Sequence, residues 1–233
     1  MAVKSILITG SSRGLGLALV EHYVNLGFQV YGCSRGESVF KSDNYEHFSL
    51  DVGNEAEVVQ MFQKIAANKI PLEILINNAG LAQSSLGVLT GGKIVNQIIQ
   101  TNLIGAFFVA REAIKIMMRF KYGRVINFSS INIPQRSSGS AIYNASKAGL
   151  AAFSDVLARE CSAQDITLNN IVLSIVANSG MADSLDQKSI KVKQAGLLKP
   201  GFLTKNEIIH AVDFLTSPLA KNITCQTLNF GGV

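Results

Sequence analysis

The sequence predicts an α/β fold, in which helices cover both faces of a parallel β-sheet. Strand-like and helix-like segments alternate along the whole chain, which is the pattern of repeated βαβ units. Several strand candidates are short, continuous apolar runs, as expected for strands that are buried on both faces. The chain has 233 residues, 48% of them hydrophobic and 16% charged, which suits one large core. Because no linker, repeat or low-complexity segment divides it, we expect a single domain over residues 1–233.

The predicted elements are the apolar runs and the longer helical stretches that lie between them. In chain order, the strand candidates are Ser5–Thr9, Gln29–Cys33, Glu46–Leu50, Ile74–Ile76, Arg124–Phe128, Leu168–Leu173 and Gln226–Asn229. The helix candidates are Leu15–Leu26, Glu55–Ala67, Lys93–Thr101, Leu103–Phe120, Tyr143–Ser162 and Lys205–Leu215.

Two of these helices predict contact with another subunit. The segment Leu103–Phe120 is apolar on nearly every side, and such a helix is buried on more than one side. In a domain of this size, that pattern points to a subunit interface. The segment Tyr143–Ser162 carries small residues that let another backbone approach closely, namely Ala145, Ala148, Gly149, Ala151 and Ala152.

Composition argues against several other classes of protein. No apolar run reaches the length of a bilayer span and no signal peptide precedes the first strand, so we expect a cytoplasmic protein without a membrane segment. The net charge is +5, but Lys and Arg are spread out, which favours an enzyme with an anionic ligand over a nucleic-acid-binding protein. Neither disulfides nor a metal site are expected from the scattered Cys33, Cys161, Cys225, His22, His47 and His210.

A glycine-rich turn follows the first strand and runs directly into a helix. Glycines let the chain turn sharply and let backbone N–H groups approach a pyrophosphate at the helix N-terminus, where the dipole favours anions. Such a run also fits a simple tight turn, but its place in a βα unit favours dinucleotide binding. The run reads Thr9-Gly10-Ser11-Ser12-Arg13-Gly14-Leu15-Gly16.

The end of the second strand favours NADP(H) over NAD(H). NAD enzymes usually have an acidic residue there for the ribose 2′-hydroxyl, whereas an arginine accommodates the 2′-phosphate of NADP. In this chain Ser34 occupies the acidic position and Arg35 follows it. Arg13, in the glycine turn, is expected to approach the same phosphate from the other side. The alternative is that one or both arginines are simply solvated. Binding of NAD(H) also remains an alternative, because the acidic Glu37 is nearby in the sequence.

Tyr143 and Lys147 are the candidate acid/base pair. They are four residues apart in a predicted helix, so their side chains lie on one face. We expect the Lys147 ammonium and the positive nicotinamide of the oxidised cofactor to favour the phenolate and to lower the pKa of Tyr143. In reduction Tyr143 would give a proton to the nascent alkoxide. Because the spacing is common in helices, it gains meaning only from the other motifs.

Together these motifs resemble the short-chain dehydrogenase/reductase family, and within it most of all the 3-oxoacyl-[acyl-carrier-protein] reductase type. The resemblance implies a Rossmann-type, doubly wound fold with seven parallel strands in the order 3-2-1-4-5-6-7, assembled as a homotetramer or homodimer. It also implies NADPH-dependent reduction of a ketone or 3-oxoacyl group to a secondary alcohol. Besides the glycine turn, it rests on Asn77-Asn78-Ala79-Gly80, Tyr143-Asn144-Ala145-Ser146-Lys147 and the tail from Thr224 to Gly232.

The resemblance implies a complete catalytic quartet of Asn102, Ser130, Tyr143 and Lys147. Ser130, at the end of the fifth strand, is expected to hydrogen-bond the substrate carbonyl and polarise it, whereas Ser129 is expected to be structural. Asn102 is expected to help hold a water that connects the lysine to solvent. From its position alone it is also a candidate N-cap of the long apolar helix, and the two roles are compatible.

The same resemblance implies the contacts of the cofactor. Asp51 would accept a hydrogen bond from the adenine amino group, and Lys147 would also bond the nicotinamide ribose. Asn78 and Gly80 would lie against the adenosine ribose, whereas Asn77 would brace the central strands. The full set is Gly10, Ser12, Arg13, Gly14, Leu15, Gly16, Ser34, Arg35, Asp51, Val52, Asn78, Ala79, Gly80, Tyr143, Lys147, Val176 and Asn178.

One segment departs from the family pattern. Where the family has Pro-Gly after the sixth strand and then a Thr that binds the carboxamide, this chain has Leu173–Ser179, with Asn178 near the place of the Thr. Three functions are therefore weighed: reduction of an acyl chain on a carrier protein, reduction of a free small ketone, and cofactor binding with a regulatory or assembly role and little turnover. The complete quartet argues against the third.

Basic residues outside the motifs are candidates for contact with a carrier protein or with an anionic substrate. Arg119, Lys121 and Arg124 would receive an acidic acyl carrier protein, although a solvated helix end is the commoner explanation of such residues. Arg136, in the loop before Tyr143, is a candidate for contact with an anionic substrate, although this is the less favoured interpretation.

Overall fold

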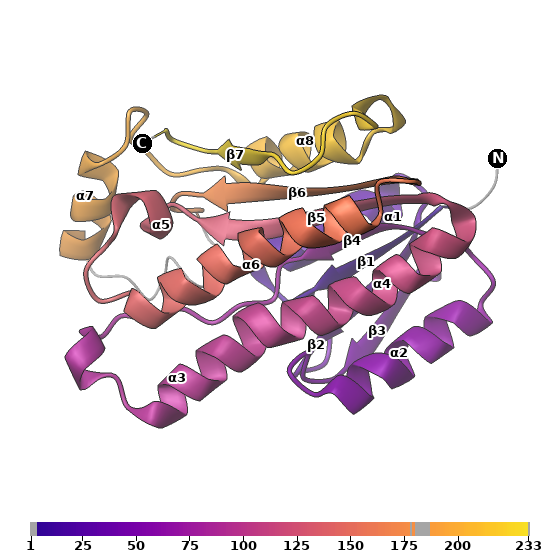
Figure 1. Cartoon of the computed structure of the whole chain (residues 1–233), viewed down its shortest axis with the longest axis horizontal. Helices are drawn as coiled ribbons and strands as arrows, with labels where there is room; N and C mark the ends of the chain where they lie inside the picture. The colour runs from indigo at the N-terminus through magenta and orange to yellow at the C-terminus, as the bar shows by residue number, and fades with distance from the viewer. Residues whose placement is uncertain (1–3, 178, 180–186, 233) are drawn as a thin grey trace.

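The computed structural model describes residues 4–177, 179 and 187–232, and Asn178 lies outside them. Its centre is a seven-stranded sheet in the order β3-β2-β1-β4-β5-β6-β7 (Figure 1). All neighbouring strands are parallel. This confirms the predicted fold class and strand order. The strands are β1 Ser5–Thr9, β2 Gln29–Ser34, β3 Tyr45–Ser49, β4 Leu72–Asn77, β5 Tyr122–Ser130, β6 Asp165–Leu173 and β7 Thr227–Asn229.

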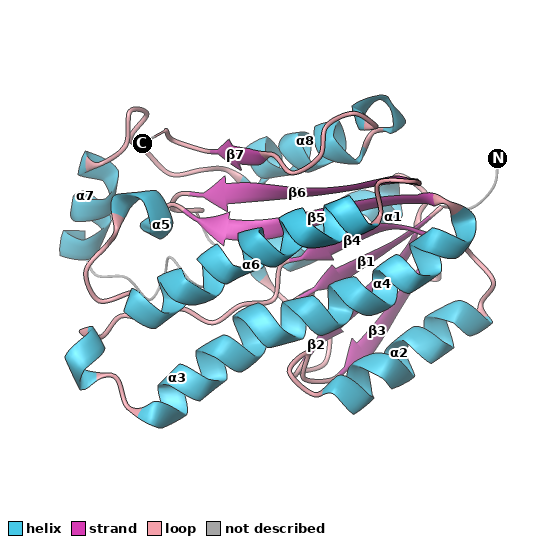
Figure 2. Ribbon diagram, in the orientation of Figure 1, coloured by secondary structure: helices cyan, strands magenta, loops and turns pink. Residues whose placement is uncertain are grey.

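Helices cover both faces of the sheet (Figure 2). Helices α2, α4 and α6 pack on one face, and α1 and α8 pack on the other. Within the described residues, no helix is long and apolar enough to cross a bilayer. The α-helices are α1 Gly14–Asn25, α2 Glu55–Ala67, α3 Gly92–Ile99, α4 Ala106–Phe120, α5 Asn132–Gln135, α6 Ala141–Glu160, α7 Gln187–Ala195 and α8 Lys205–Thr216. Short 3₁₀ turns lie at Gly87–Leu89 and Pro218–Ala220.

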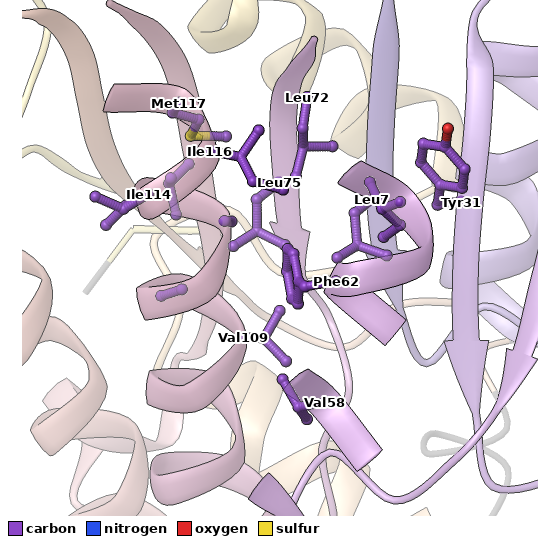
Figure 3. Close-up of a cluster of buried hydrophobic side chains, with 14 of the residues drawn as sticks. Leu7, Tyr31, Val58, Phe62, Leu72, Leu75, Val109, Ile114, Ile116 and Met117 are labelled. Carbon is purple, nitrogen blue, oxygen red and sulfur yellow. The ribbon is translucent and has the colours of Figure 1, made fainter. Parts of the chain in front are cut away.

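The central strands are buried on both sides, as their continuous apolar sequences require. On β1, Leu7 points to the core under α2 and α4, whereas Ile6 and Ile8 point to the core under α1 and α8. Figure 3 shows the first of these cores, in which Phe62 of α2 and Val109 of α4 pack over the strands. Two cores of this kind hold the carboxyl ends of the central strands in fixed relative positions.

Helix boundaries follow local capping chemistry. At the start of α2, the Asn54 side chain accepts hydrogen bonds from the backbone N–H groups of Ala56 and Glu57. At the start of α8, Thr204 and Glu207 form a capping box. Both helices begin where the sequence predicts them.

The helices that were expected at Lys93–Thr101 and Leu103–Phe120 are continuous. A π-helical turn, Gln100–Gly105, joins α3 to α4 without a break, and Asn102 lies inside it. The prediction that Asn102 caps the long apolar helix is therefore wrong, because no helix begins there. A π-turn inserts one extra residue into the helical repeat, and such turns are frequent at functional sites.

Two helices of the structure were not predicted from the sequence. Helix α5 is only four residues long, and α7 has no strong apolar periodicity in its sequence. The segment after β6 that lacks the family's Pro-Gly leads into Val176, which pairs in parallel with Leu203. Helix α5 and this segment both border the carboxyl edge of the sheet, where the site lies.

Candidate active site

A cleft of about 790 Å³ runs along the carboxyl ends of the strands, from the glycine turn to α7. This is the edge at which doubly wound sheets bind their ligands. Its volume lies within the usual range for small-molecule and cofactor sites. Apart from Asn178, all predicted cofactor residues except Gly14 line it: Gly10, Ser12, Arg13, Leu15, Gly16, Ser34, Arg35, Asp51, Val52, Asn78, Ala79, Gly80, Tyr143, Lys147 and Val176.

The glycine turn depends on backbone geometry that other residues do not tolerate. Gly10 and Gly14 have φ values of +68° and +62°, a region that favours glycine. A Cβ on Gly16 would overlap the carbonyl oxygen of Gly10, so α1 can start this close to β1 only with glycine there. The sequence thus brings the first turn of α1 to the floor of the cleft.

Helix α1 differs from α2 and α8 in how it begins. Arg13 at its N-cap makes no side-chain capping bond, and its first turn contains no acidic residue. Within the described residues, its positive dipole end is therefore not offset by a side chain of the helix itself. A pyrophosphate is the kind of group that this end of a helix attracts. The residues present fit a dinucleotide.

The two asparagines of the Asn77–Gly80 segment hydrogen-bond to neighbouring parts of the sheet edge. Asn78 donates its amide to the carbonyl oxygens of Thr9 at 2.7 Å and Gly10 at 3.1 Å. It thereby fixes the glycine turn to the end of β4. Asn77 donates to Asn127 Oδ1 at 2.8 Å across β4 and β5, which confirms that it braces the central strands. The two asparagines thus hold β4 against β5 and against the glycine turn that lines the cleft.

The end of β2 combines two exposed arginines with a histidine that the sequence analysis did not single out. Arg13 and Arg35 are exposed, line the cleft and make no ion pair among the described residues. His47 Nε2 lies 3.2 Å from Ser34 Oγ and 2.9 Å from the Gly36 carbonyl oxygen, so it braces the loop that carries Arg35.

Glu37, the acidic residue that would favour NAD(H), does not line the main cleft. Glu37 accepts a hydrogen bond from Ser49 at 2.8 Å. It borders a separate hollow of about 390 Å³ and does not line the main cleft. Asp51 does line the cleft, where its Oδ1 accepts the Gly53 N–H at 2.9 Å.

Ser130 and Tyr143 meet on one wall of the cleft. Ser130 comes from the end of β5 and Tyr143 from the first turn of α6. Tyr143 is only 6% exposed, and its burial raises the pKa of its hydroxyl, while the nearby Ser130 hydroxyl opposes that rise.

Lys147 lies one helical turn beyond Tyr143 and is 4% exposed. Its Nζ donates to the Phe128 carbonyl oxygen at 2.7 Å. Burial lowers the pKa of Lys147 to about 8, because the charged form is desolvated. For the residues of the chain alone, burial of Tyr143 dominates and raises its pKa, so the lowering expected from Lys147 together with the oxidised nicotinamide stays a prediction.

Asn102 lies behind the cleft and not in its lining. It is fully buried in the π-turn, where its Oδ1 accepts the Leu81 N–H at 2.7 Å and its Nδ2 donates to the Leu81 carbonyl at 2.8 Å. A Cβ placed on Gly80 would lie 3.5 Å from Asn102 Oδ1 and 3.6 Å from Lys147 Nζ. The two side chains therefore approach the same small volume over Gly80.

The structure adds cleft residues that the sequence analysis missed. Gln83 Oε1 accepts the backbone N–H groups of Ile142 at 3.0 Å and Tyr143 at 3.2 Å, so it caps α6 from a distant loop. Lys193 of α7 reaches the opposite end of the cleft and donates to Asn132 at 2.8 Å. No local motif marks either residue, because each acts across about 60 positions of sequence.

The basic residues that were considered for contact with a carrier protein or an anionic substrate do not line the cleft. Arg124 is fully buried and pairs with Asp165 at 2.8 Å, so the prediction that it receives a carrier protein is wrong. Arg119 and Lys121 adjoin the start of β5, at the opposite end of that strand from Ser130. Arg136 is exposed at the end of α5 and does not line the cleft.

Comparison with known proteins gives consistent relatives. A family model described as short chain dehydrogenase matches residues 4–190. The 3-oxoacyl-[acyl-carrier-protein] reductase FabG of Escherichia coli (strain K12) is 33% identical over 236 aligned residues, which cover 98% of this chain and 96% of that protein.

Solved structures share the fold. A short chain dehydrogenase from Leptospira borgpetersenii serovar Hardjo-bovis with bound NAD⁺ has a TM-score of 0.89 at 24% identity, covering 100% of this chain and 92% of that one. A variant of actinorhodin polyketide ketoreductase with NADPH has a TM-score of 0.88 at 24% identity, covering 100% and 98%.

Proposed function

The chain belongs to the short chain dehydrogenase family, and from this premise we propose that it reduces a ketone or 3-oxoacyl group to a secondary alcohol with NADPH. The observation that carries the proposal is the convergence of three side chains on one cleft. Ser130, Tyr143 and Lys147 line the same cleft as the glycine turn, and the Ser130 hydroxyl is near enough to Tyr143 to act on its pKa. A substrate oxygen near both hydroxyl groups would receive a hydrogen bond and a proton.

The proposed mechanism divides the reaction between these residues. When bound, NADPH would be the source of the hydride for the carbonyl carbon. Ser130 donates a hydrogen bond to the carbonyl oxygen, and Tyr143 transfers its hydroxyl proton to that oxygen as the alcohol forms. The raised pKa of Tyr143 keeps the phenol protonated at neutral pH, as a proton donor requires. The nascent alkoxide is far more basic than the phenolate, so the transfer is favourable.

Lys147 and Asn102 support the tyrosine. The Lys147 ammonium would stabilise the phenolate that remains and would bond the nicotinamide ribose. Asn102 holds the Leu81 backbone through two hydrogen bonds and faces Lys147 over Gly80. We propose that it keeps a water-filled route by which the lysine and then Tyr143 regain a proton.

The arginines support NADPH in preference to NADH. Arg13 and Arg35 line the cleft without an ion-pair partner among the described residues, while Glu37 bonds Ser49 outside it. A 2′-phosphate between two guanidinium groups would gain charge-assisted hydrogen bonds. Because both NADPH and NAD⁺ occur among the structural relatives, the fold itself does not choose the cofactor.

The assembly and location follow as part of the same proposal. Phe107 of α4 lies edge-on against Phe153 of α6 with ring centroids 5.7 Å apart, and Val156, three residues further along α6, is 54% exposed. Small residues on α6 leave room for another backbone over this face, including the exposed Ala145 and Ala152. We propose a cytoplasmic homotetramer, or a homodimer, that uses this face.

The test compares three variants for NADPH affinity and for ketone reduction. Tyr143→Phe keeps the ring but removes the proton, so turnover should fall by roughly 10² to 10⁴-fold while NADPH affinity stays normal. Ser130→Ala should mainly slow turnover. Lys147→Ala should weaken both, because it loses the ribose contact and the support for the phenolate.

Ser129→Ala is the matched control for Ser130→Ala. Ser129 is the preceding residue of β5, and its buried hydroxyl has no partner among the described residues. Its loss should leave both measurements near those of the parent. If Tyr143→Phe reduces a good substrate as fast as the parent, the mechanism is wrong.

A further inference from the structure

Lys193 brings a second ammonium group to the cleft, at the end away from the glycine turn. It lies in α7 and lines the cleft together with Ser130 and Tyr143. Its Nζ donates to Asn132 Oδ1 at 2.8 Å. The backbone N–H of Asn132 donates in turn to Ser130 Oγ at 3.2 Å. One asparagine and two hydrogen bonds therefore separate this ammonium from the proposed carbonyl-binding hydroxyl.

The position of Lys193 is fixed by contacts on its backbone side. Gln135 of α5 donates to the Lys193 carbonyl oxygen at 2.8 Å. Gly196, just after α7, lies so close to Gln135 that a Cβ there would be 2.8 Å from its Nε2. Leu197 then packs into a small apolar cluster with Ile131 and Val172. The lysine is thus held in place before any substrate arrives.

The charge of Lys193 is not neutralised by a carboxylate among the described residues. Its side-chain hydrogen bond goes to a neutral amide oxygen, and none of the ion pairs in the described part of the chain includes it. Asp51 is the acidic residue among the described cleft-lining residues, and it lies at the adenine end, bonded to Gly53. Partial burial disfavours the charged form of Lys193 and lowers its pKa, and an anion bound beside the ammonium would oppose that effect.

We propose that Lys193 binds a carboxylate of the substrate, so that the preferred substrates are short oxo acids with the carboxylate a few bonds from the reacting carbonyl. The inference rests on the proposed function, because it assigns the carbonyl end to Ser130 and Tyr143. A charged partner in a partly buried site gains more than a neutral one, since charge-assisted hydrogen bonds are about twice as strong. A thioester or ester presents no such charge at that point.

The test pairs short 2-oxo and 3-oxo acids with their methyl esters. Each pair presents the same ketone with and without the negative charge. The parent should reduce an acid with a kcat/KM at least about tenfold above that of its ester. Lys193→Met should lower kcat/KM for the acid by about ten- to a hundredfold, the scale of one hydrogen bond to a charged group. The ester should change by less than about twofold.

Lys191→Met is the matched control. Lys191 lies on the same helix two residues earlier, is exposed and does not line the cleft. Its loss should change neither substrate class. Lys193→Arg should restore part of the preference for acids, because it returns the positive charge. NADPH affinity should be unchanged in all three variants.

A binding measurement separates failure of this inference from failure of the proposed function. The corresponding hydroxy acids and their methyl esters are titrated into the parent and into Lys193→Met, each with NADP⁺, by calorimetry. Tighter binding of the acid that is lost in Lys193→Met supports the carboxylate site even if no ketone is reduced. Equal binding of acid and ester overturns it even if ketones are reduced well.

Discussion

The two ends of the cleft are built in different ways. At the cofactor end, a run of eight residues from Thr9 to Gly16 sets the geometry through backbone conformation, and Asn78 holds it from the neighbouring strand. At the substrate end, side chains from separate elements meet, as Lys193 meets Asn132 from 61 positions away. The first end is local in sequence and the second depends on tertiary contacts. We therefore expect substitutions in the glycine turn to affect mainly cofactor binding, and substitutions around Lys193 to affect mainly substrate choice.

We expect the largest effect from a substitution in the glycine turn at the cofactor end. Gly16→Ala places a Cβ against the carbonyl oxygen of Gly10, and backbone must move to relieve the overlap. Misplacing the first turn of α1 should weaken NADPH binding on the order of a hundredfold. Calorimetry with NADPH measures the effect, and thermal unfolding shows whether the variant remains folded.

Gly92→Ala is the control for this variant, because a Cβ there would meet no atom within 4 Å. It should leave NADPH affinity unchanged. Normal NADPH affinity in folded Gly16→Ala would show that cofactor binding does not depend on this backbone geometry.

A smaller effect is expected from the arginine at the end of β2. Arg35→Ala should cost about 1.5–3 kcal/mol of NADPH binding free energy, because one charge-assisted phosphate contact is lost. NADH, which lacks the 2′-phosphate, should bind as it does to the parent. Lys41→Ala is the control, since Lys41 is an exposed cation that borders the separate hollow. Equal affinity of the parent for NADPH and NADH would refute the assignment.

Ketone reduction should depend on pH through Lys147. Because the pKa of Lys147 is lowered to about 8, its ammonium is present below that pH and is lost above it. The kcat/KM for ketone reduction should therefore fall by about tenfold per pH unit above about pH 8. A pH profile at constant ionic strength measures this. A rate that stays level to about pH 10 is incompatible with a required Lys147 ammonium.

The smallest expected effect concerns Gln83. Gln83→Ala leaves the backbone N–H groups of Ile142 and Tyr143 without their side-chain acceptor at the start of α6. Loss of a helix cap should lower the free energy of unfolding by about 0.5–2 kcal/mol. Gln83 Nε2 also donates to the Ser85 carbonyl and to Thr90 Oγ1, so Gln83→Glu keeps the cap acceptor but loses these two bonds, and comparison of the two variants separates the contributions. Denaturant unfolding that gives the same free energy for Gln83→Ala and the parent would show that the cap is dispensable.

The fold was predictable because its signals are local. The strand Ser5–Thr9 and the helix Glu55–Ala67 were predicted to the residue, the first from a fully buried apolar run. The glycine turn and the motif around Tyr143 likewise depend on short spacings. All of them lie within single elements or their ends, where periodicity and capping rules apply directly.

The substrate end was less predictable because its contacts join distant segments. No pattern in α7 indicates that Lys193 enters the cleft, and nothing around Gln83 indicates that it caps α6. Asn102 was assigned as a possible cap because a π-turn has no simple sequence signature. The sequence predicts Arg124 to be a surface residue, whereas it is buried, forms an ion pair with Asp165 and donates to the carbonyl oxygens of Gly123 and Asp165.

The most direct test of the central claim is the consumption of NADPH in the presence of carbonyl substrates. The purified chain is mixed with NADPH and a panel of short oxo acids, neutral ketones and 3-oxoacyl thioesters, and the absorbance of NADPH is followed. We expect consumption of NADPH that requires both the ketone and Tyr143, with formation of the secondary alcohol. Tight NADPH binding with no consumption across the panel would contradict it and would favour a cofactor-binding role without turnover.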